Sequence, residues 1–381
     1  MKTCWAVYSC WTTGDDGSWA RYDHPTPVGQ DGELPRLLAN FAARGITDRI
    51  LVFPGPTDPR IEAHLQRIVD RFPQLDVHVL TGADIARILR TLADGGFPAT
   101  YADVMNVDQY GRLRNMSLLY AIMHGFDNVI QIDDDELIED PAYLTNALGD
   151  MGKDFKGQPI YGKSGYYVDA AGTKYYDGQM SVTFPTWPKD ERFNEAVKNA
   201  FAAQSRLSDC HVAFGGNMAI NRKLFLHVPY DQIGLPRGED DDYVMNARKS
   251  GYVFVFDAEL WIRHLPPKRD GLYWARPRQD IKRFKYLREK IRLFGHKPED
   301  MGVFFDYFLR EDLEYKAVTA SIAAYRYYQD KDRAEAEEFL NNALVAVEPN
   351  RADLRQQAER QLRFMDDWAR VMPKVEGAWK R

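Results

Sequence analysis

The sequence predicts an α/β protein in which helices cover a mostly parallel sheet and a helical region follows at the C-terminus. Up to about residue 140, short β-branched apolar runs alternate with amphipathic helical patterns, which is the order that builds a parallel sheet. From about Arg276 onward glycine becomes rare and helical periodicity takes over. Two runs of adjacent carboxylates, at residues 133–136 and 239–242, lie next to regular elements.

The composition is that of an ordinary globular protein and excludes some classes. Of the 381 residues 45% are hydrophobic, and the formal net charge of −6 argues against a nucleic-acid binder, which needs a basic surface. The three cysteines, Cys4, Cys10 and Cys210, lack the pattern of a disulfide framework or a zinc site, so we interpret them as core thiols. No apolar run reaches the ~18 residues of a membrane span and no signal-peptide pattern opens the chain. We therefore expect no transmembrane segment and a cytoplasmic protein.

Alternating strands and helices are expected in the N-terminal part. Buried strands are predicted where apolar β-branched residues cluster, at residues 3–9, 49–53 and 77–80. Amphipathic helices are predicted at residues 34–41, closed by Gly45, and at residues 61–69, after a turn and cap at 54–58. The Gly-, Asp- and Pro-rich stretch from Thr12 to Gly32 fits either a nucleotide-binding edge or a surface loop.

The stretch Asn128–Glu139 starts as a strand and ends in an acidic cluster. Apolar β-branched residues between 129 and 132 are followed at once by Asp133, Asp134, Asp135 and Glu136. Adjacent carboxylates repel one another. At the end of a strand in an α/β sheet they would face the crevice where ligands bind, and a divalent cation would relieve the repulsion. A solvated turn is the alternative, and the preceding strand favours the metal site.

A helix is predicted from Gly111 to His124, directly before the acidic strand. Arg112 and Arg114 lie near its start, where a guanidinium matches the phosphate oxygens of a nucleotide bidentately. A salt bridge to the neighbouring acidic residues is the other interpretation. The salt bridge is preferred for Arg112, and both interpretations stay open for Arg114.

A second acidic cluster strengthens the metal interpretation. Gly238-Glu239-Asp240-Asp241-Asp242 precedes a helical pattern, and a strand at residues 252–256 then leads to Ile262-Arg263-His264. On these motifs the chain resembles the GT-A glycosyltransferases, family 2-like, which transfer a sugar from a nucleotide-sugar. Asp133-Asp134-Asp135 is similar to their Asp-x-Asp motif, and the second cluster with His264 is similar to the β-1,4-galactosyltransferase pattern. The segment Phe214-Gly215-Gly216-Asn217 also resembles the one that precedes the acidic helix in that group. The resemblance covers about residues 1–270.

The resemblance implies a GT-A fold, Rossmann-like with helices on both faces of a mixed, mostly parallel sheet, and a metal-dependent hexosyltransferase. The donor would be a UDP- or GDP-linked hexose, and the acceptor a carbohydrate or small molecule with a hydroxyl group. Mn²⁺ or Mg²⁺ would be held by Asp133, Asp135 and His264 and would stabilise the charge on the leaving diphosphate. An imidazole ligand favours Mn²⁺. Arg114 and Asp134 would contact the donor.

The same resemblance implies that Asp240 is the general base of an inverting transfer, with Glu239, Asp241 and Gly216 at the acceptor. A helix N-terminus favours the ionised form of Asp240, whereas the adjacent carboxylates raise its pKa. Three alternatives stay open: a retaining GT-A transferase with the same metal site, a sugar nucleotidyltransferase, and a non-catalytic metal-dependent carbohydrate-binding protein.

Between the acidic clusters, residues 161–187 are rich in tyrosine and glycine. Alternation at residues 179–184 predicts antiparallel hairpins. Aromatic side chains stack on sugars, but most of those here are expected to be ordinary sheet residues. Trp187 is the one that we select as an acceptor contact.

The stretch from Pro266 to Trp274 fits a lid over the donor, because it contains paired prolines and a glycine directly after His264. Lys268 and Arg269 would then reach the diphosphate, and Tyr273 or Trp274 would cover the sugar. A solvated domain linker is the alternative.

The C-terminal region is predicted to be an antiparallel helical bundle, with helices at residues 281–293, 315–328, 333–347 and 352–371. We therefore divide the chain into a catalytic domain at 1–270 and a lid, linker and helical domain at 271–381. The helical domain would serve packing, or the assembly of a homo-oligomer.

Overall fold

The computed structural model describes residues 1–14, 22, 25–175, 186–203, 205–232, 237–267 and 273–380. The chain forms two compact units. The first contains Met1–Gly172, Ser205–Pro267 and Arg363–Arg381, and the second contains Thr173–Gln204 and Lys268–Leu362. The predicted boundary at residue 270 lies beside one of these junctions, and the division into domains stays a prediction.

Within the described residues, the first unit is built on a mixed, 11-stranded sheet. Its main path is, in order, β4 (Val77–Val79), β3 (Arg49–Gly55), β1 (Thr3–Thr12), β5 (Asn128–Asp133), β10 (Met218–Asn221), β8 (Gln158–Val168), β11 (Val253–His264) and β6 (Glu136–Leu137). Strands β4, β3, β1 and β5 pair in parallel, as do β8 and β11, whereas β10 and β6 pair antiparallel. The short strands β2 (Thr26–Pro27), β7 (Asp154–Phe155) and β9 (Leu207–Asp209) pair with β1, β8 and β11. The predicted mixed, mostly parallel sheet is confirmed.

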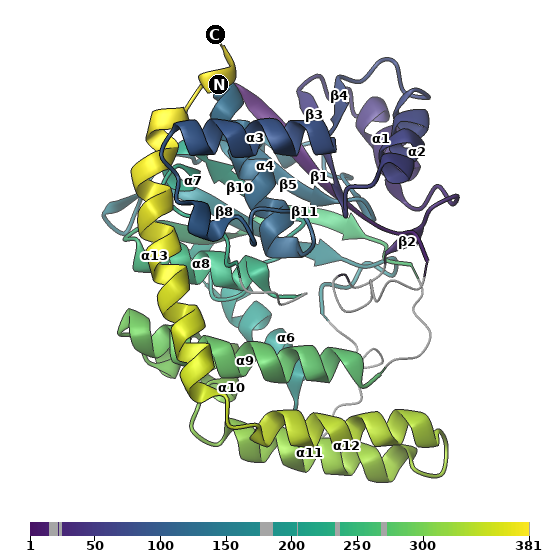
Figure 1. The fold of residues 1–381 in the computed structure, drawn as a ribbon, viewed down its shortest axis with the longest axis vertical. Coiled ribbons are helices and arrows are strands. Elements are labelled where there is room, and N and C mark those ends of the chain that lie inside the picture. The colour runs from purple at the N-terminus through teal and green to yellow at the C-terminus, as the bar shows by residue number, and fades with distance from the viewer. Residues whose placement is uncertain are drawn as a thin grey trace. The chain divides into compact units, whose positions relative to one another are not determined.

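Helices cover both faces of this sheet. Those of the first unit are α1 (Leu34–Ala43), α2 (Pro59–Val69), α3 (Gly82–Asp94), α4 (Tyr110–His124), α5 (Tyr143–Leu148), α7 (Arg222–Phe225), α8 (Glu239–Lys249) and the last turns of α13 (Arg351–Val375). Side chains alternate between faces along β1. Trp5 packs against Phe41 of α1, with ring centroids 4.9 Å apart, whereas the Tyr8 and Ser117 hydroxyls, on β1 and α4, lie 2.7 Å apart. Figure 1 shows α1 and α2 together beside β3 and β4.

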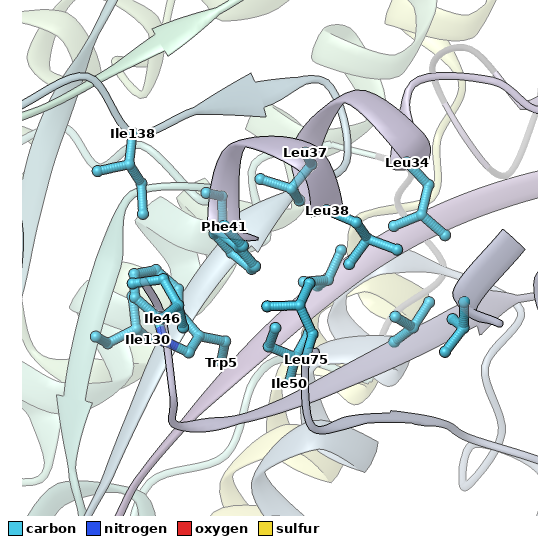
Figure 2. Close-up of a cluster of buried hydrophobic side chains, with 14 of the residues drawn as sticks. Trp5, Leu34, Leu37, Leu38, Phe41, Ile46, Ile50, Leu75, Ile130 and Ile138 are labelled. Atoms are coloured by element: carbon cyan, nitrogen blue, oxygen red, sulfur yellow. The ribbon is translucent and has the colours of Figure 1, made fainter. Parts of the chain in front are cut away.

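The core on the α1 side of the sheet shows why this helix forms where it does. Its apolar residues Leu34, Leu37, Leu38 and Phe41 follow the i, i+3, i+4, i+7 spacing that places side chains on one helix face, and all are fully buried. Figure 2 shows these side chains pointing from the helix toward Trp5 and its neighbours on the strands. Pro35 near the helix start also suits the first turn, which needs no backbone donor there.

The second unit is helical. It contains α6 (Lys189–Phe201), α9 (Ala275–Phe294), α10 (Val303–Phe308), α11 (Leu313–Tyr328), α12 (Arg333–Val347) and the first turns of α13. Figure 1 shows α11 and α12 side by side as an antiparallel hairpin. Lys285 of α9 donates to the carbonyl oxygens of Val345, Ala346 and Glu348, so its positive charge lies at the C-terminal end of α12. The predicted helical C-terminal region is confirmed, and none of the described helices is long and apolar enough to span a membrane.

Some elements differ from the sequence prediction. Helices α3 and α6 were not predicted. Helix α3 begins with a capping box of Thr81 and Asp84, a signal that can be recognised in the sequence. The expected strand at 252–256 and the segment at 261–264 form one strand, β11, because register shifts let the chain continue along β8. The predicted hairpin at 179–184 lies outside the described residues.

Replacing Phe41 by alanine tests the core in Figure 2. We expect Phe41→Ala to lower the free energy of unfolding by about 3–5 kcal/mol, because it leaves a cavity against Trp5. Chemical denaturation measures the change. Arg90→Ala is the control, since Arg90 is exposed on α3 and its loss should change stability by less than about 0.5 kcal/mol. Equal effects of the two changes would contradict the packing.

Candidate active site

The candidate site forms where β5 ends and the chain returns as the short strand β6. Strand β6 pairs antiparallel with the end of β11, and this register places His264 directly opposite Glu136. The Leu265 amide donates to the Asp135 carbonyl at 2.9 Å, which continues the contact beyond the ladder. As a result, His264 Nε2 lies 3.4 Å from Asp135 Oδ2. Two segments separated by more than a hundred residues therefore meet at one point.

Three side chains at this point could hold a metal ion. Asp135, Glu136 and His264 each offer a ligand atom, and these atoms lie within 4.8 Å of one another. Asp135 and Glu136 are 1% and 0% exposed, whereas the His264 side chain is 29% exposed and open to solvent. Carboxylate oxygens with an imidazole nitrogen suit Mn²⁺, which accepts both kinds of ligand. The donor set therefore fits the cation that the sequence predicts.

Gly216 keeps space beside these ligands. A Cβ atom at this position would lie 2.1 Å from Glu136 Oε1 and 2.2 Å from Oε2, so no side chain fits without moving the carboxylate. The Gly216 amide donates to the Tyr167 hydroxyl at 2.7 Å. The Tyr167 ring in turn packs against His264, with centroids 4.6 Å apart. Gly216, predicted at the acceptor, thus lies next to the metal-ligand candidates.

Several buried carboxylates lie close together at the end of β5, and their pKa values are raised. Burial raises the pKa of Asp133 to about 6, opposed by Arg114 and reinforced by the Asp135 charge. Burial and the charges of Asp133 and Asp135 raise the pKa of Glu136 well above its usual value, against smaller opposing hydrogen bonds from the Asp133 amide and Tyr167. Burial, with Asp135 next in size, likewise raises the pKa of Asp134. The positive charge of a divalent cation bound here would instead favour the ionised forms of these carboxylates.

Asp134 is directed away from the metal-ligand group. Its Oδ2 accepts a hydrogen bond from Ser9 Oγ at 2.5 Å, and Ser9 in turn accepts one from Trp11 Nε1 at 2.9 Å. The Asp134 amide donates to the Tyr8 carbonyl at 3.1 Å. The middle residue of the acidic triplet therefore joins β5 to the end of β1. Its predicted role at the donor stays a prediction.

Arg114 joins the two acidic clusters. The guanidinium is buried, and its Nε donates to Glu239 Oε1 at 2.7 Å while Nη2 lies 3.4 Å from Asp133 Oδ1. Nη1 donates to the Gly215 carbonyl at 2.8 Å, and the group lies 4.4 Å from the centroid of the Tyr8 ring. Arg114 therefore forms the salt bridges of one interpretation, and its predicted contact with the donor stays a prediction. Arg112 instead lies beside the Gln232 carbonyl, at 3.3 Å from Nε.

The acidic residues of α8 hold the chain that precedes β10. Asp240 Oδ2 accepts from the Gly215 amide and Oδ1 from the Asp241 amide, both at 2.9 Å. Asp241 is 6% exposed and accepts from the Ala213 amide at 2.8 Å. Gly238 opens the helix with a φ of 81°, a left-handed conformation that glycine adopts without strain. Asp240 is the more exposed of these two aspartates, being partly buried where Asp241 is buried.

Two of the predicted acceptor residues, Glu239 and Asp241, are engaged in contacts within the protein. Glu239 is bonded to Arg114, and burial, the largest cause, raises its pKa against the effect of that guanidinium. Asp241 is buried and accepts a hydrogen bond from the Ala213 amide. Both therefore have structural partners beside the predicted acceptor role.

The other predicted residues belong to the second unit, and some of them lie outside the described residues. Trp187 belongs to the second unit, where it is 6% exposed and packs against Phe284 and Phe308, with centroids 5.9 and 4.9 Å apart. Trp274 is also buried there, and its backbone amide donates to Glu335 Oε1 at 2.7 Å. Lys268 and Arg269 lie outside the described residues. Glu136 is the ligand candidate that sequence reasoning missed, because only the pairing of β6 with β11 reveals it.

Comparisons with known proteins bear on the fold. No protein-family model matches the chain, and no curated protein matches it. A mannosyltransferase from Pyrobaculum calidifontis in complex with GDP-Man and Mn²⁺ aligns with 100% of this chain and 88% of its own, at 14% identity and a TM-score of 0.51. Glucosyl-3-phosphoglycerate synthase from Mycobacterium tuberculosis, with Mn²⁺ and UDP-glucose, aligns with 78% of this chain and 80% of its own, at 11% identity and a TM-score of 0.42. The first comparison confirms the GT-A fold.

Alanine substitutions within the acidic triplet test the direction of its side chains. We expect Asp135→Ala to weaken Mn²⁺ binding by at least about tenfold, because it removes a carboxylate that faces His264. Asp134→Ala should weaken it less, since Ser9 holds that carboxylate toward β1. Titration calorimetry with Mn²⁺ measures both. Equal losses would mean that the triplet binds the cation in another register.

Proposed function

We propose that this chain is a metal-dependent glycosyltransferase that moves a hexose from a UDP- or GDP-linked donor to a hydroxyl group of a carbohydrate or small-molecule acceptor. The observation that carries the proposal is the group of Asp135, Glu136 and His264 at the end of β5, next to the acidic start of α8, within a GT-A fold. In that fold the crevice at the carboxyl ends of the strands is where ligands bind. The solved mannosyltransferase with this fold contains GDP-Man and Mn²⁺, which supports the same class of donor and cation here.

The proposed chemistry requires charge stabilisation on the leaving group. Cleavage of the sugar–phosphate bond leaves negative charge on the nucleoside diphosphate, and bound Mn²⁺ or Mg²⁺ supplies the positive charge that stabilises it. Asp135 and His264 would hold that cation, and Glu136 lies within reach of the same position. Gly216 leaves the space that these side chains need. Lys268 and Arg269 stay candidates for the diphosphate.

Asp240 is the proposed general base of an inverting transfer. The two backbone amides that bind its oxygens fix the carboxylate in one orientation, which a positioned base needs. It is partly exposed at the start of α8, whereas Asp241 and Asp242 are buried. Removal of the acceptor's proton by Asp240, on the face opposite the leaving group, would invert the anomeric carbon.

A retaining transferase with the same metal site is the second candidate. The observation in its favour is that both Asp240 oxygens already accept backbone hydrogen bonds within the protein. The configuration of the product separates the two mechanisms.

A screen of nucleotide-sugars tests the proposed reaction. We expect slow, Mn²⁺-dependent hydrolysis of at least one UDP- or GDP-linked hexose, because a site that activates the leaving group also lets water react. Release of the nucleoside diphosphate should stop when a chelator removes the cation. Activity that persists in excess chelator after metal removal would contradict the role of the cation.

Asp240→Asn tests the base. The change keeps the shape and removes the basicity, so turnover should fall by roughly two to four orders of magnitude while donor affinity changes little. Asp94→Asn, at the exposed end of α3, is the control and should leave turnover unchanged. Product NMR adds an independent readout, because an α-linked donor must give a β-linked product. Retention of the α linkage, or a near-normal rate for Asp240→Asn, would support the retaining mechanism instead.

A further inference from the structure

We propose that Glu136 is a protein ligand of the divalent cation, together with Asp135 and His264, and that Asp133 is not. The proposal rests on the proposed metal dependence and specifies the ligands of that site. It differs from the expectation based on the Asp-x-Asp motif, in which the two outer aspartates, Asp133 and Asp135, share the cation.

The backbone places Glu136 on the same side as His264. The two residues are directly opposed in the antiparallel pair of β6 and β11, and opposed residues carry their side chains on one face with Cβ atoms about 4.5–5.5 Å apart. The amide of the residue after His264 binds the Asp135 carbonyl, so main-chain hydrogen bonds hold all three ligands in register. This juxtaposition depends on the ladder and not on a flexible loop.

The Glu136 side chain is buried, and its carboxylate lies close to Asp135 and His264. The residue is 0% exposed, and Oε1 receives no hydrogen bond of standard geometry from any described residue. Its Oε2 accepts from the Asp133 amide at 2.7 Å, and Tyr167 also contributes a hydrogen bond to the carboxylate. A buried carboxylate without full compensation is costly, and a cation shared with Asp135 and His264 would supply the missing partner. A permanently protonated acid with a structural role is the competing explanation.

Asp133 is directed to a different partner. Its Oδ1 lies 3.4 Å from Arg114 Nη2, and the side chain is 28% exposed. Its backbone amide, rather than its carboxylate, contacts Glu136. The first aspartate of the triplet therefore neutralises the buried guanidinium, and Glu136 takes the place of the second carboxylate in the metal site.

Mn²⁺ binding to matched isosteric variants tests the proposal. Electron paramagnetic resonance of free Mn²⁺ would be recorded with wild type, Glu136→Gln, Asp135→Asn and Asp133→Asn, each without nucleotide and with GDP or UDP. We expect Glu136→Gln and Asp135→Asn to weaken binding by at least about tenfold, and Asp133→Asn to weaken it by less. Wild-type affinity in Glu136→Gln would overturn the proposal, as would a loss in Asp133→Asn as large as that in Asp135→Asn.

A second variant keeps the test decisive if Glu136→Gln does not fold. Gly216→Ala retains the Glu136 charge, but its Cβ would lie 2.1 Å from Oε1 and must displace the carboxylate, so it should also weaken Mn²⁺ binding. Gly82→Ala is the control, since its Cβ would meet only Glu62 at 3.7 Å. Wild-type affinity in Gly216→Ala would then contradict the proposal.

Two further outcomes separate the proposal from the proposed function. Absence of Mn²⁺ binding to the wild type under every nucleotide condition would overturn the ligand assignment. Mn²⁺ binding that depends on Glu136, without turnover of any nucleotide-sugar, would support the ligand assignment and count against the glycosyltransferase.

Discussion

The buried guanidinium of Arg114 is the charge on which the arrangement of the site depends. It lies on α4 and contacts Asp133 at the end of β5, Glu239 at the start of α8 and the Gly215 carbonyl before β10. The carboxylate partners come from segments about a hundred residues apart, and each would be costly to bury alone. One delocalised cation with five donors can satisfy several acceptors at once, which an ammonium group cannot do in the same geometry. Arg114 thus makes it possible for two acidic clusters to share one region of the fold.

The remaining carboxylates at the strand end are accommodated in different ways. Asp134 is held by the Ser9 hydroxyl, and the α8 aspartates Asp240 and Asp241 accept backbone amides of residues 213–215. Asp135 and Glu136 lie near His264, where the positive charge of a cation would stabilise their anionic forms. Because neighbouring carboxylates have different partners, the residues within each acidic run have different roles. Only part of each run is directed toward the position where a cation and its ligand would bind.

The sequence predicted the elements better than the contacts between them. Strand β5 and the start of α8 were located, because β-branched runs and an acidic first turn are local signals. Glu136 was missed because its position opposite His264 depends on a two-residue strand, β6, which has no sequence signature of its own. The partner of Arg114 stayed open for a related reason. A guanidinium near a helix start fits phosphate and carboxylate equally well, and its carboxylate partners Asp133 and Glu239 become visible only in the structure.

Trp187 illustrates the same limit for apolar residues. An aromatic residue in a Tyr- and Gly-rich stretch fits a sugar platform or a helical core, and composition does not separate the two. Its contacts with Phe284 and Phe308 come from helices more than ninety residues away in sequence. Such distant packing is invisible to periodicity within one segment.

The site is therefore specified mainly by backbone pairing and less by the identity of its carboxylates. The β6–β11 ladder opposes Glu136 to His264, and the amides of residues 213 and 215 orient the α8 carboxylates. Gly215 and Gly216 are required because side chains there would collide with Arg114 and Glu136, at 2.6 Å and 2.1 Å from the added Cβ atoms. A change of backbone register of one residue would turn Glu136 or His264 to the opposite face of the sheet, even with every acidic residue retained. It follows that acidic motifs are informative about this site only together with the strands that carry them.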